Sequence, residues 1–211
     1  MFLQKGDEMK EIRSFDFEVR AEVNDQGSVL TGQPIVYDAR TNLGWYDEII
    51  DNGSLAATDL RDVRFLVNHN TDMIPLARSR NNNANSTMQM EVVDGAGMNI
   101  RVNLDTENNA DAKALYSAVE RGDISGMSFM FTVDEDNWED PDSEHPTRHI
   151  RAISKVFEVS AVTFPAYEAT SIQARGLSDA LESARTSLES AKAEKREKDR
   201  LREKIRILAE V

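Results

Sequence analysis

Residues 153–164 read ISKVFEVSAVTF, an extended run in which apolar side chains fall on both faces of the chain. A strand that is apolar on both faces is typical of the interior of a sheet. We therefore expect residues 153–164 to form a strand that is central in its sheet or part of a closed barrel. One carboxylate interrupts the pattern, because Glu158 shares a face with Val156 and Val162. A buried carboxylate costs several kcal/mol unless it is paired, so Glu158 needs a partner.

The chain before this stretch shows the two-residue alternation of half-buried strands. Such strands are expected over residues 12–23, 29–37, 47–50, 63–69, 88–93, 98–104 and 127–133. The turn Asn24-Asp25-Gln26-Gly27 joins the first two and predicts an antiparallel hairpin. The chain is thus expected to be mainly β.

Two segments have helical character instead. Between residues 106 and 121 the apolar side chains recur at the spacing i, i+3, i+4 and i+7, and Gly122 can end this helix. From Ser178 to Val211 there is no Gly or Pro, and eight acidic residues nearly balance nine basic ones. This composition predicts a long, solvated helix that is too charged for a continuous coiled-coil seam. We expect it to project from the core, where it either binds a partner or remains a passive tail.

These changes of character predict three parts. We expect a flexible N-terminal lead over residues 1–11, a folded domain over residues 12–176, and a charged helical arm over residues 177–211. Within the domain, residues 134–148 are acidic and contain two prolines, which predicts an exposed excursion of the chain.

The composition excludes several classes of protein. The 211 residues include 25 Lys and Arg against 38 Asp and Glu, a net charge of −13, which repels phosphate backbones, so we expect no nucleic-acid partner. Cysteine is absent, which excludes disulfides, thiolate metal sites and a cysteine nucleophile. No window approaches the ~18 continuous apolar residues of a membrane span, and no signal peptide opens the chain, so we expect a soluble cytoplasmic protein. Phosphate-binding glycine loops and zinc-binding histidine spacings are also missing, so we expect no cofactor and no metal.

The side chains that could carry catalysis are few. A serine hydroxyl is a weak nucleophile until an adjacent base removes its proton, and the chain offers only His69, His145 and His149 as imidazole bases. His69 ends the strand expected over residues 63–69, where a turn would place it beside the sheet. A histidine in such a position is more often structural, so position alone does not make it catalytic.

Ser128 and Glu158 also have ordinary structural interpretations. Ser128 lies between Met127 and Phe129 in an expected strand, where a serine is usually just a small residue that fits, although the preceding helix and the compact turn from Ser125 give it a defined position. Glu158 either forms a salt bridge with an arginine, such as Arg64 or Arg78, or orients a catalytic imidazole and balances its positive charge.

Six motifs follow one another in an order that resembles a known family. They are GQPIVYD, LGWYDEIIDNGSL, FLVNHN with PLAR, GAGMNIRVNL, RGDISGMSFMF and EVSAVTFPAY, all within residues 12–170. In this order the chain resembles the prohead proteases of tailed bacteriophages of the HK97 type, which share a fold with the herpesvirus assembly proteases. The resemblance implies a mainly β fold with helices (α+β): a closed or nearly closed antiparallel β-barrel of the herpesvirus-protease type with flanking helices, plus the long C-terminal helix.

The resemblance also implies a serine endopeptidase. Its motifs make His69, the histidine of VNHN, the general base, and Ser128, the second serine of ISGMS, the nucleophile. In herpesvirus relatives a second histidine completes the triad. Here we expect Glu158 of the EVS motif in that place and not His149, which precedes the strand.

The substrates that the resemblance implies are the major capsid protein precursor, scaffold segments and the protease itself, cleaved inside the assembling prohead in the host cell cytoplasm. A homodimer is expected by analogy with the herpesvirus relatives, without a nucleic acid or membrane partner. Two other functions remain open at this point. One is a catalytically silent scaffold or assembly protein that recruits coat protein through its C-terminal helix, and the other is a cellular hydrolase with unrelated substrates.

Overall fold

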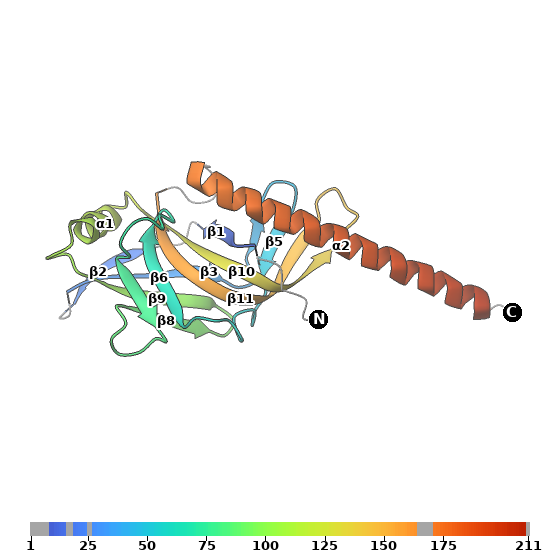
Figure 1. Cartoon of the computed structure of the whole chain (residues 1–211), viewed down its shortest axis with the longest axis horizontal. Helices are drawn as coiled ribbons and strands as arrows, with labels where there is room; N and C mark the ends of the chain where they lie inside the picture. The colour runs from blue at the N-terminus through green and yellow to red at the C-terminus, as the bar shows by residue number, and fades with distance from the viewer. Residues whose placement is uncertain (1–8, 16–18, 25–26, 164–170, 210–211) are drawn as a thin grey trace, which may run out of the picture.

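The computed structural model describes residues 9–15, 19–24, 27–163 and 171–209, and within them the chain forms eleven strands and two helices (Figure 1). The strands are β1 (Glu11–Phe15), β2 (Arg20–Asn24), β3 (Gly27–Val36), β4 (Arg40–Asn42), β5 (Asp47–Ile50), β6 (Asp62–Val67), β7 (Ala77–Arg80), β8 (Met88–Val93), β9 (Gly97–Leu104), β10 (Gly126–Glu139) and β11 (Thr147–Val162). The helices are α1 (Ala110–Glu120) and α2 (Ser171–Ala209). The prediction of a mainly β fold with helices is confirmed. Most of the expected N-terminal lead lies outside the described residues.

The strands belong to two sheets. In the seven-stranded sheet the order is β1-β10-β11-β5-β4, and β6 also pairs with β11 and carries β7 on its other edge. The four-stranded sheet has the order β2-β3-β9-β8. Single backbone hydrogen bonds link the sheets, from Thr87 N to Arg78 O (3.0 Å) and from Val19 N to Ser125 O (3.3 Å). In the described part of the chain neither sheet closes on itself, so the strand pairing forms two open sheets, whereas a closed or nearly closed barrel was expected.

The strand that includes residues 153–162 is central, as predicted. β11 pairs antiparallel with β10 along one edge, and along the other edge it pairs in parallel with β5 and then with β6. Its apolar side chains at Val156, Val159 and Val162 are fully buried, which explains the continuous apolar pattern. The end of the expected run, Phe164, lies outside the described residues.

Most residues of the segment 134–148 are exposed, as predicted, but the expected excursion is wrong for much of the segment, which is strand. β10 continues to Glu139 and β11 begins at Thr147, so only residues 140–146 connect the two strands. The acidic composition gave no indication that some side chains of this segment are buried, among them Trp138, Thr147 and Arg148. A two-stranded ribbon can carry many polar residues when another element packs against it.

The strand expected over residues 12–23 is two strands in different sheets. β1 pairs with β10 in the larger sheet, whereas β2 pairs with β3 in the smaller one, and residues 16–18 between them lie outside the described residues. The predicted hairpin is confirmed, because Asn24 lies opposite Gly27. The short strand β4 was not expected, because three residues are too few to show a period.

Helix α1 begins four residues later than expected and ends as predicted. The Asn109 side chain caps it by accepting hydrogen bonds from Asp111 N (2.9 Å) and Ala112 N (3.2 Å). At the other end Gly122 has φ +77, a left-handed conformation that glycine adopts without strain.

Helix α2 is longer than expected and is only partly a projecting arm. It has 39 residues, about 58 Å at 1.5 Å per residue, and runs through Gly176 without interruption. Its first part lies along the larger sheet, and its C-terminal part extends beyond both sheets (Figure 1). Ala180, Ala184 and Leu188 are buried, and the last two pack with Tyr46 and Trp138 in a small apolar cluster.

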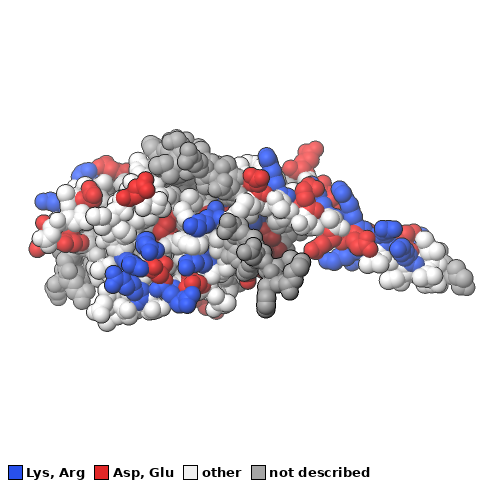
Figure 2. All heavy atoms as spheres, in the orientation of Figure 1, with Lys and Arg blue, Asp and Glu red and all other residues white. Residues whose placement is uncertain are grey.

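The projecting part of α2 is charged on its surface, and basic and acidic side chains alternate along it (Figure 2). Pairs three residues apart bring opposite charges together, as in Arg200 with Glu197 and Arg206 with Glu203. Such exposed pairs add little stability each, but they keep an isolated helix solvated. Neither described helix is long and apolar enough to cross a membrane.

Candidate active site

His69 lies in a tight turn that follows β6. The strand runs beside β11 as far as the pair Val67 and Ala161, and Asn68 N then donates to Ala161 O at 2.9 Å. Asn68 and His69 both have positive φ angles, 51° and 57°, and Asn70 N closes the turn on Val67 O at 3.0 Å. Asn and His are among the residues that tolerate this left-handed conformation. The turn therefore folds the imidazole back over β11.

The partner that Glu158 requires is this imidazole. Glu158 Oε1 lies 2.5 Å from His69 Nδ1, and the residues are only 2% and 4% exposed. The other carboxylate oxygen, Oε2, accepts a hydrogen bond from Ser160 Oγ at 2.5 Å, and Ser160 Oγ accepts one from His69 N at 3.1 Å. Because an ionised carboxylate only accepts hydrogen bonds, the proton of the neutral imidazole lies on Nδ1 and Nε2 keeps its lone pair.

The alternative partners proposed for Glu158 are wrong. Arg78 Nε lies 2.6 Å from Asp62 Oδ1, and Arg64 Nη2 lies 3.3 Å from Asp62 Oδ2. Both arginines therefore pair with the same surface carboxylate, and the buried carboxylate pairs with histidine.

Ser128 lies on β10, directly opposite Ser160 on β11. Residues opposite each other in an antiparallel pair share a face, with Cβ atoms about 4.5–5.5 Å apart. Ser128 thus stands on the same face as Ser160 and Glu158, next to the His69–Glu158 pair. The structure brings together all three side chains that the motifs suggested.

The hydroxyl of Ser128 is turned away from the imidazole. It is fully buried and donates to Arg13 O at 2.7 Å, and Arg13 belongs to β1 on the opposite edge of β10 from β11. His69 Nε2 is buried and has no hydrogen-bond partner in the described part of the chain. The His–Glu half of a catalytic triad is therefore assembled, whereas the Ser–His hydrogen bond is not formed.

The other two histidines lie elsewhere. His149 Nδ1 is 2.8 Å from Asp51 Oδ1, and the residue precedes Glu158 by nine positions on β11, about 30 Å at 3.3 Å per residue. His145 Nε2 is 2.9 Å from Asp47 Oδ1 at the surface. The geometry therefore brings Glu158, and not His149, to His69.

A buried ionic cluster beneath α2 was not anticipated from the sequence. Its fully buried members are Glu11, Arg13, Glu48 and Arg148. Arg13 Nη2 donates to Glu11 Oε2 and Glu48 Oε2, each at 2.6 Å, and Arg148 Nη1 donates to Glu11 Oε2 at 2.9 Å. From α2, Ser183 Oγ donates to Glu11 Oε1 at 2.7 Å. One sequence signal was available, namely the opposite charges two residues apart on β1.

The charges of this cluster are mutually stabilised. Burial by itself would raise the pKa of Glu11, but the positive charges of Arg13 and Arg148 outweigh it and hold that pKa below its usual value. Burial by itself would lower the pKa of Arg13, but the negative charges around it, chiefly that of Glu48, raise this pKa well above the ordinary value. Burial also raises the pKa of the neighbouring Tyr46 to about 12. The cluster fixes β1, whose Arg13 carbonyl holds the Ser128 hydroxyl.

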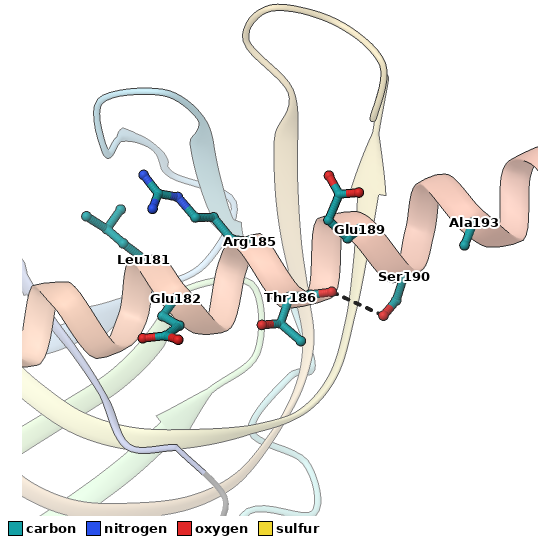
Figure 3. A pocket seen from close by; sticks show the side chains of 7 residues that line it. All are labelled: Leu181, Glu182, Arg185, Thr186, Glu189, Ser190 and Ala193. Carbon is teal, nitrogen blue, oxygen red and sulfur yellow. Dashed lines mark hydrogen bonds between the residues drawn. The ribbon is translucent and has the colours of Figure 1, made fainter.

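A separate groove of about 910 Å³ runs along α2 (Figure 3). Its described lining comes from that helix alone, with Leu181, Arg185 and Glu189 on one side of the view and Ser190 bonded to the Thr186 carbonyl at 3.1 Å. No described lining residue belongs to β6, β10 or β11. The groove is therefore a surface of the helix and not part of the site around His69.

An imidazole held at Nδ1 by a buried carboxylate is the His and acid pair that serine hydrolases of the triad type use, and Ser128 lies on the strand next to that carboxylate. The model of the caudovirus prohead serine protease family matches residues 15–183, and the chain belongs to this family. The resemblance stated from the motifs is confirmed. The match includes His69, Ser128, Glu158 and the first turns of α2. No curated protein and no solved structure matches the chain significantly.

Membership in this family gives the protein a general role. Its members are serine proteases of capsid maturation, which act on capsid and scaffold proteins within the assembling capsid of a tailed phage. Which side chains perform the reaction and which bonds are cut depend on the site described above.

Proposed function

We propose that this chain is an endopeptidase that cleaves scaffold and capsid-precursor segments, and its own chain, with Ser128 as nucleophile, His69 as general base and Glu158 as the orienting carboxylate. The observation that carries the proposal is the buried 2.5 Å contact between His69 Nδ1 and Glu158 Oε1. A carboxylate in that place fixes the tautomer in which Nε2 can take a proton.

The reaction begins with a change at Ser128. Its hydroxyl leaves the Arg13 carbonyl and turns across β10 toward His69, a rotation of the side chain between staggered positions. One hydrogen bond is exchanged for another, so the net cost is small compared with an activation barrier. His69 Nε2 then accepts the proton while Oγ attacks the scissile carbonyl carbon.

The later steps follow from the same contacts. The imidazolium that forms is balanced by the negative charge of Glu158, whose second oxygen stays bonded to Ser160. His69 returns the proton to the leaving amine, and the peptide bond breaks as the acyl group stays on Oγ. A water molecule then gives a proton to Nε2 while its oxygen attacks the acyl carbon. The bond between that carbon and Oγ breaks to release the acid, and Nε2 passes the proton to Oγ, which restores the hydroxyl of Ser128.

The direct test is labelling with a fluorophosphonate, which reacts only with an activated serine. We expect the label on Ser128 in the unaltered protein and its loss in Ser128→Ala and His69→Ala. Ser125→Ala, which changes an exposed serine three residues earlier, is the matched control and should be labelled normally. Labelling that persists in His69→Ala would exclude His69 as the base.

A catalytically silent assembly protein is the second candidate, and one observation favours it. Ser128 is fully buried and bonded to Arg13, so in this structure its hydroxyl is neither exposed nor aligned with the base. In that case the projecting part of α2, with the exposed side chains of Leu201, Ile205 and Leu208, would be the functional surface that recruits coat protein. Absence of any fluorophosphonate adduct under assembly conditions would favour this candidate.

A further inference from the structure

A pocket of about 590 Å³ lies next to His69, between the turn after β6 and helix α1. Asn68 and Asn70, the two neighbours of His69 in the chain, line one side of it, and Ala114 and Leu115 of α1 line the other. In Figure 1 α1 stands at the end of the molecule where β6 finishes. We call this hollow the α1 pocket.

The wall of the α1 pocket is apolar. Val67 and Met73 contribute to it from the β6 side, and Ile124 contributes from the segment that leads into β10. Ile74, next to Met73 in the chain, is 82% exposed, which is unusual for a large apolar side chain. Apolar surface that remains in contact with water favours an apolar occupant.

The charges that line the α1 pocket indicate which kind of side chain it can bind. Asp111, in the first turn of α1, is an exposed carboxylate on the lining, and no Lys or Arg is among the described lining residues. A carboxylate on the occupant would be repelled. The lining is mostly apolar and its one carboxylate, Asp111, is exposed to solvent. The pocket therefore favours an uncharged aliphatic side chain of a bound peptide over a basic one.

The position of the pocket connects it to catalysis. A peptide whose scissile carbonyl reaches Ser128 must pass close to His69, and side chains of an extended peptide project about every 3.3 Å along it. Since both neighbours of His69 line the pocket, a side chain within a residue or two of the cleaved bond can enter it.

We propose that the α1 pocket receives a leucine, isoleucine or methionine side chain of the substrate close to the scissile bond and thereby determines which bonds are cut. This inference rests on the proposed roles of His69 and Ser128. Ala114 and Ala118 are small where they face the pocket, which leaves the space for such a side chain.

The test compares two tryptophan substitutions on α1. Ala114→Trp fills the pocket from an exposed helix position, whereas Lys113→Trp adds the same side chain at an exposed position that is rotated about 100° from Ala114 and is not among the described lining residues. Each protein digests a mixed peptide library, and mass spectrometry identifies the cleaved bonds. Pairs of peptides that differ only by Leu or Ala at the selected position then give the ratio of their kcat/KM values.

We expect the unaltered protein and Lys113→Trp to prefer Leu over Ala at one position by at least about tenfold, as hydrophobic pockets do. In Ala114→Trp the ratio should fall below about threefold. Because the ratio is taken within one sample, a smaller amount of folded enzyme does not affect it.

Three results would overturn the inference. The first is an unchanged preference in Ala114→Trp. The second is a preference for Lys or Arg that disappears in Asp111→Asn, which would show that the pocket binds a basic side chain. The third is labelling of Ser128 together with cleavage that shows no side-chain preference, which leaves the proposed function standing. Failure of fluorophosphonate labelling in the unaltered protein would reject the proposed function and this inference with it.

Discussion

The substitution Glu158→Gln tests the central contact of the site with little change of shape. Glutamine has nearly the volume of glutamate, and its amide can keep hydrogen bonds both to His69 and to Ser160. What it removes is the negative charge next to an imidazole in a buried site, where the residues are 2% and 4% exposed.

The size of the effect follows from the distance. With Oε1 at 2.5 Å from Nδ1, the centres of the carboxylate and imidazolium charges are about 4 Å apart, and two unit charges at that separation attract by about 4 kcal/mol at an effective dielectric constant of 20. This attraction exists only when the imidazole is protonated, as it is in the transition state. Since about 1.4 kcal/mol corresponds to a factor of ten, kcat should fall about a thousandfold.

The fold should survive the change. Replacing a hydrogen bond to a charged acceptor by one to a neutral amide costs about 1–3 kcal/mol, against a total stability of about 5–15 kcal/mol for a domain. Peptide cleavage measures kcat, the rate of fluorophosphonate labelling measures the reactivity of Ser128, and a urea titration measures the free energy of unfolding. Glu139→Gln is the matched control, because Glu139 is a surface carboxylate 3.5 Å from His149. It should behave as the unaltered protein.

A kcat within about threefold of normal in folded Glu158→Gln would refute the role of its charge. If His149→Ala lost activity while Glu158→Gln kept it, the triad would have a second histidine despite the distance along β11. Either result would contradict the reading of the His69–Glu158 contact as catalytic.

Three further predictions concern the ionic cluster and helix α2. Arg148→Met removes one of the two arginines that pair with the buried Glu11 and Glu48, so it should lower the free energy of unfolding in urea by about 3–5 kcal/mol. Arg151→Met, at a 48% exposed side chain on the same strand, should lower it by less than about 1 kcal/mol, and equal losses would contradict the buried cluster. The native pKa of Glu11 lies below its ordinary 4.5, so its contribution to stability is complete above that pH and is lost as the pH falls through the lower native value. Urea titrations at several pH values should show Glu11→Gln less stable at pH 7 and the difference shrinking as the pH is lowered below 4.5, and a constant difference would argue against the shift. Truncation after Lys195 should leave peptide cleavage intact but impair packaging into proheads, and normal packaging would show that the projecting part of α2 is a passive tail. Truncation after Gly176 also removes the helical segment that covers the ionic cluster, so it should in addition lower the melting temperature.

The local pattern of the sequence was sufficient for several elements. The double-sided apolar run before Val162 predicted a central strand, and the turn from Asn24 to Gly27 predicted a hairpin, because both depend on alternation and turn chemistry between near neighbours. Gly122 marked the end of α1 for the same reason. His69 and Ser128 were accessible as candidates, because the chain has three histidines and the motifs are specific.

Only the tertiary structure decided what those elements face. The partner of Glu158 could have been Arg64, Arg78 or an imidazole, and the parallel pairing of β6 with β11 selected His69. The acidic segment after Val133 forms strands because α2 covers part of it, a contact between residues about fifty positions apart, such as Trp138 Nε1 with Ser187 Oγ at 3.0 Å. Alternation along a chain reports which side of a strand is buried but not which group covers it, since that is set by pairings distant in sequence. The orientation of the Ser128 hydroxyl toward β1, away from its proposed base, belongs to the same class of information.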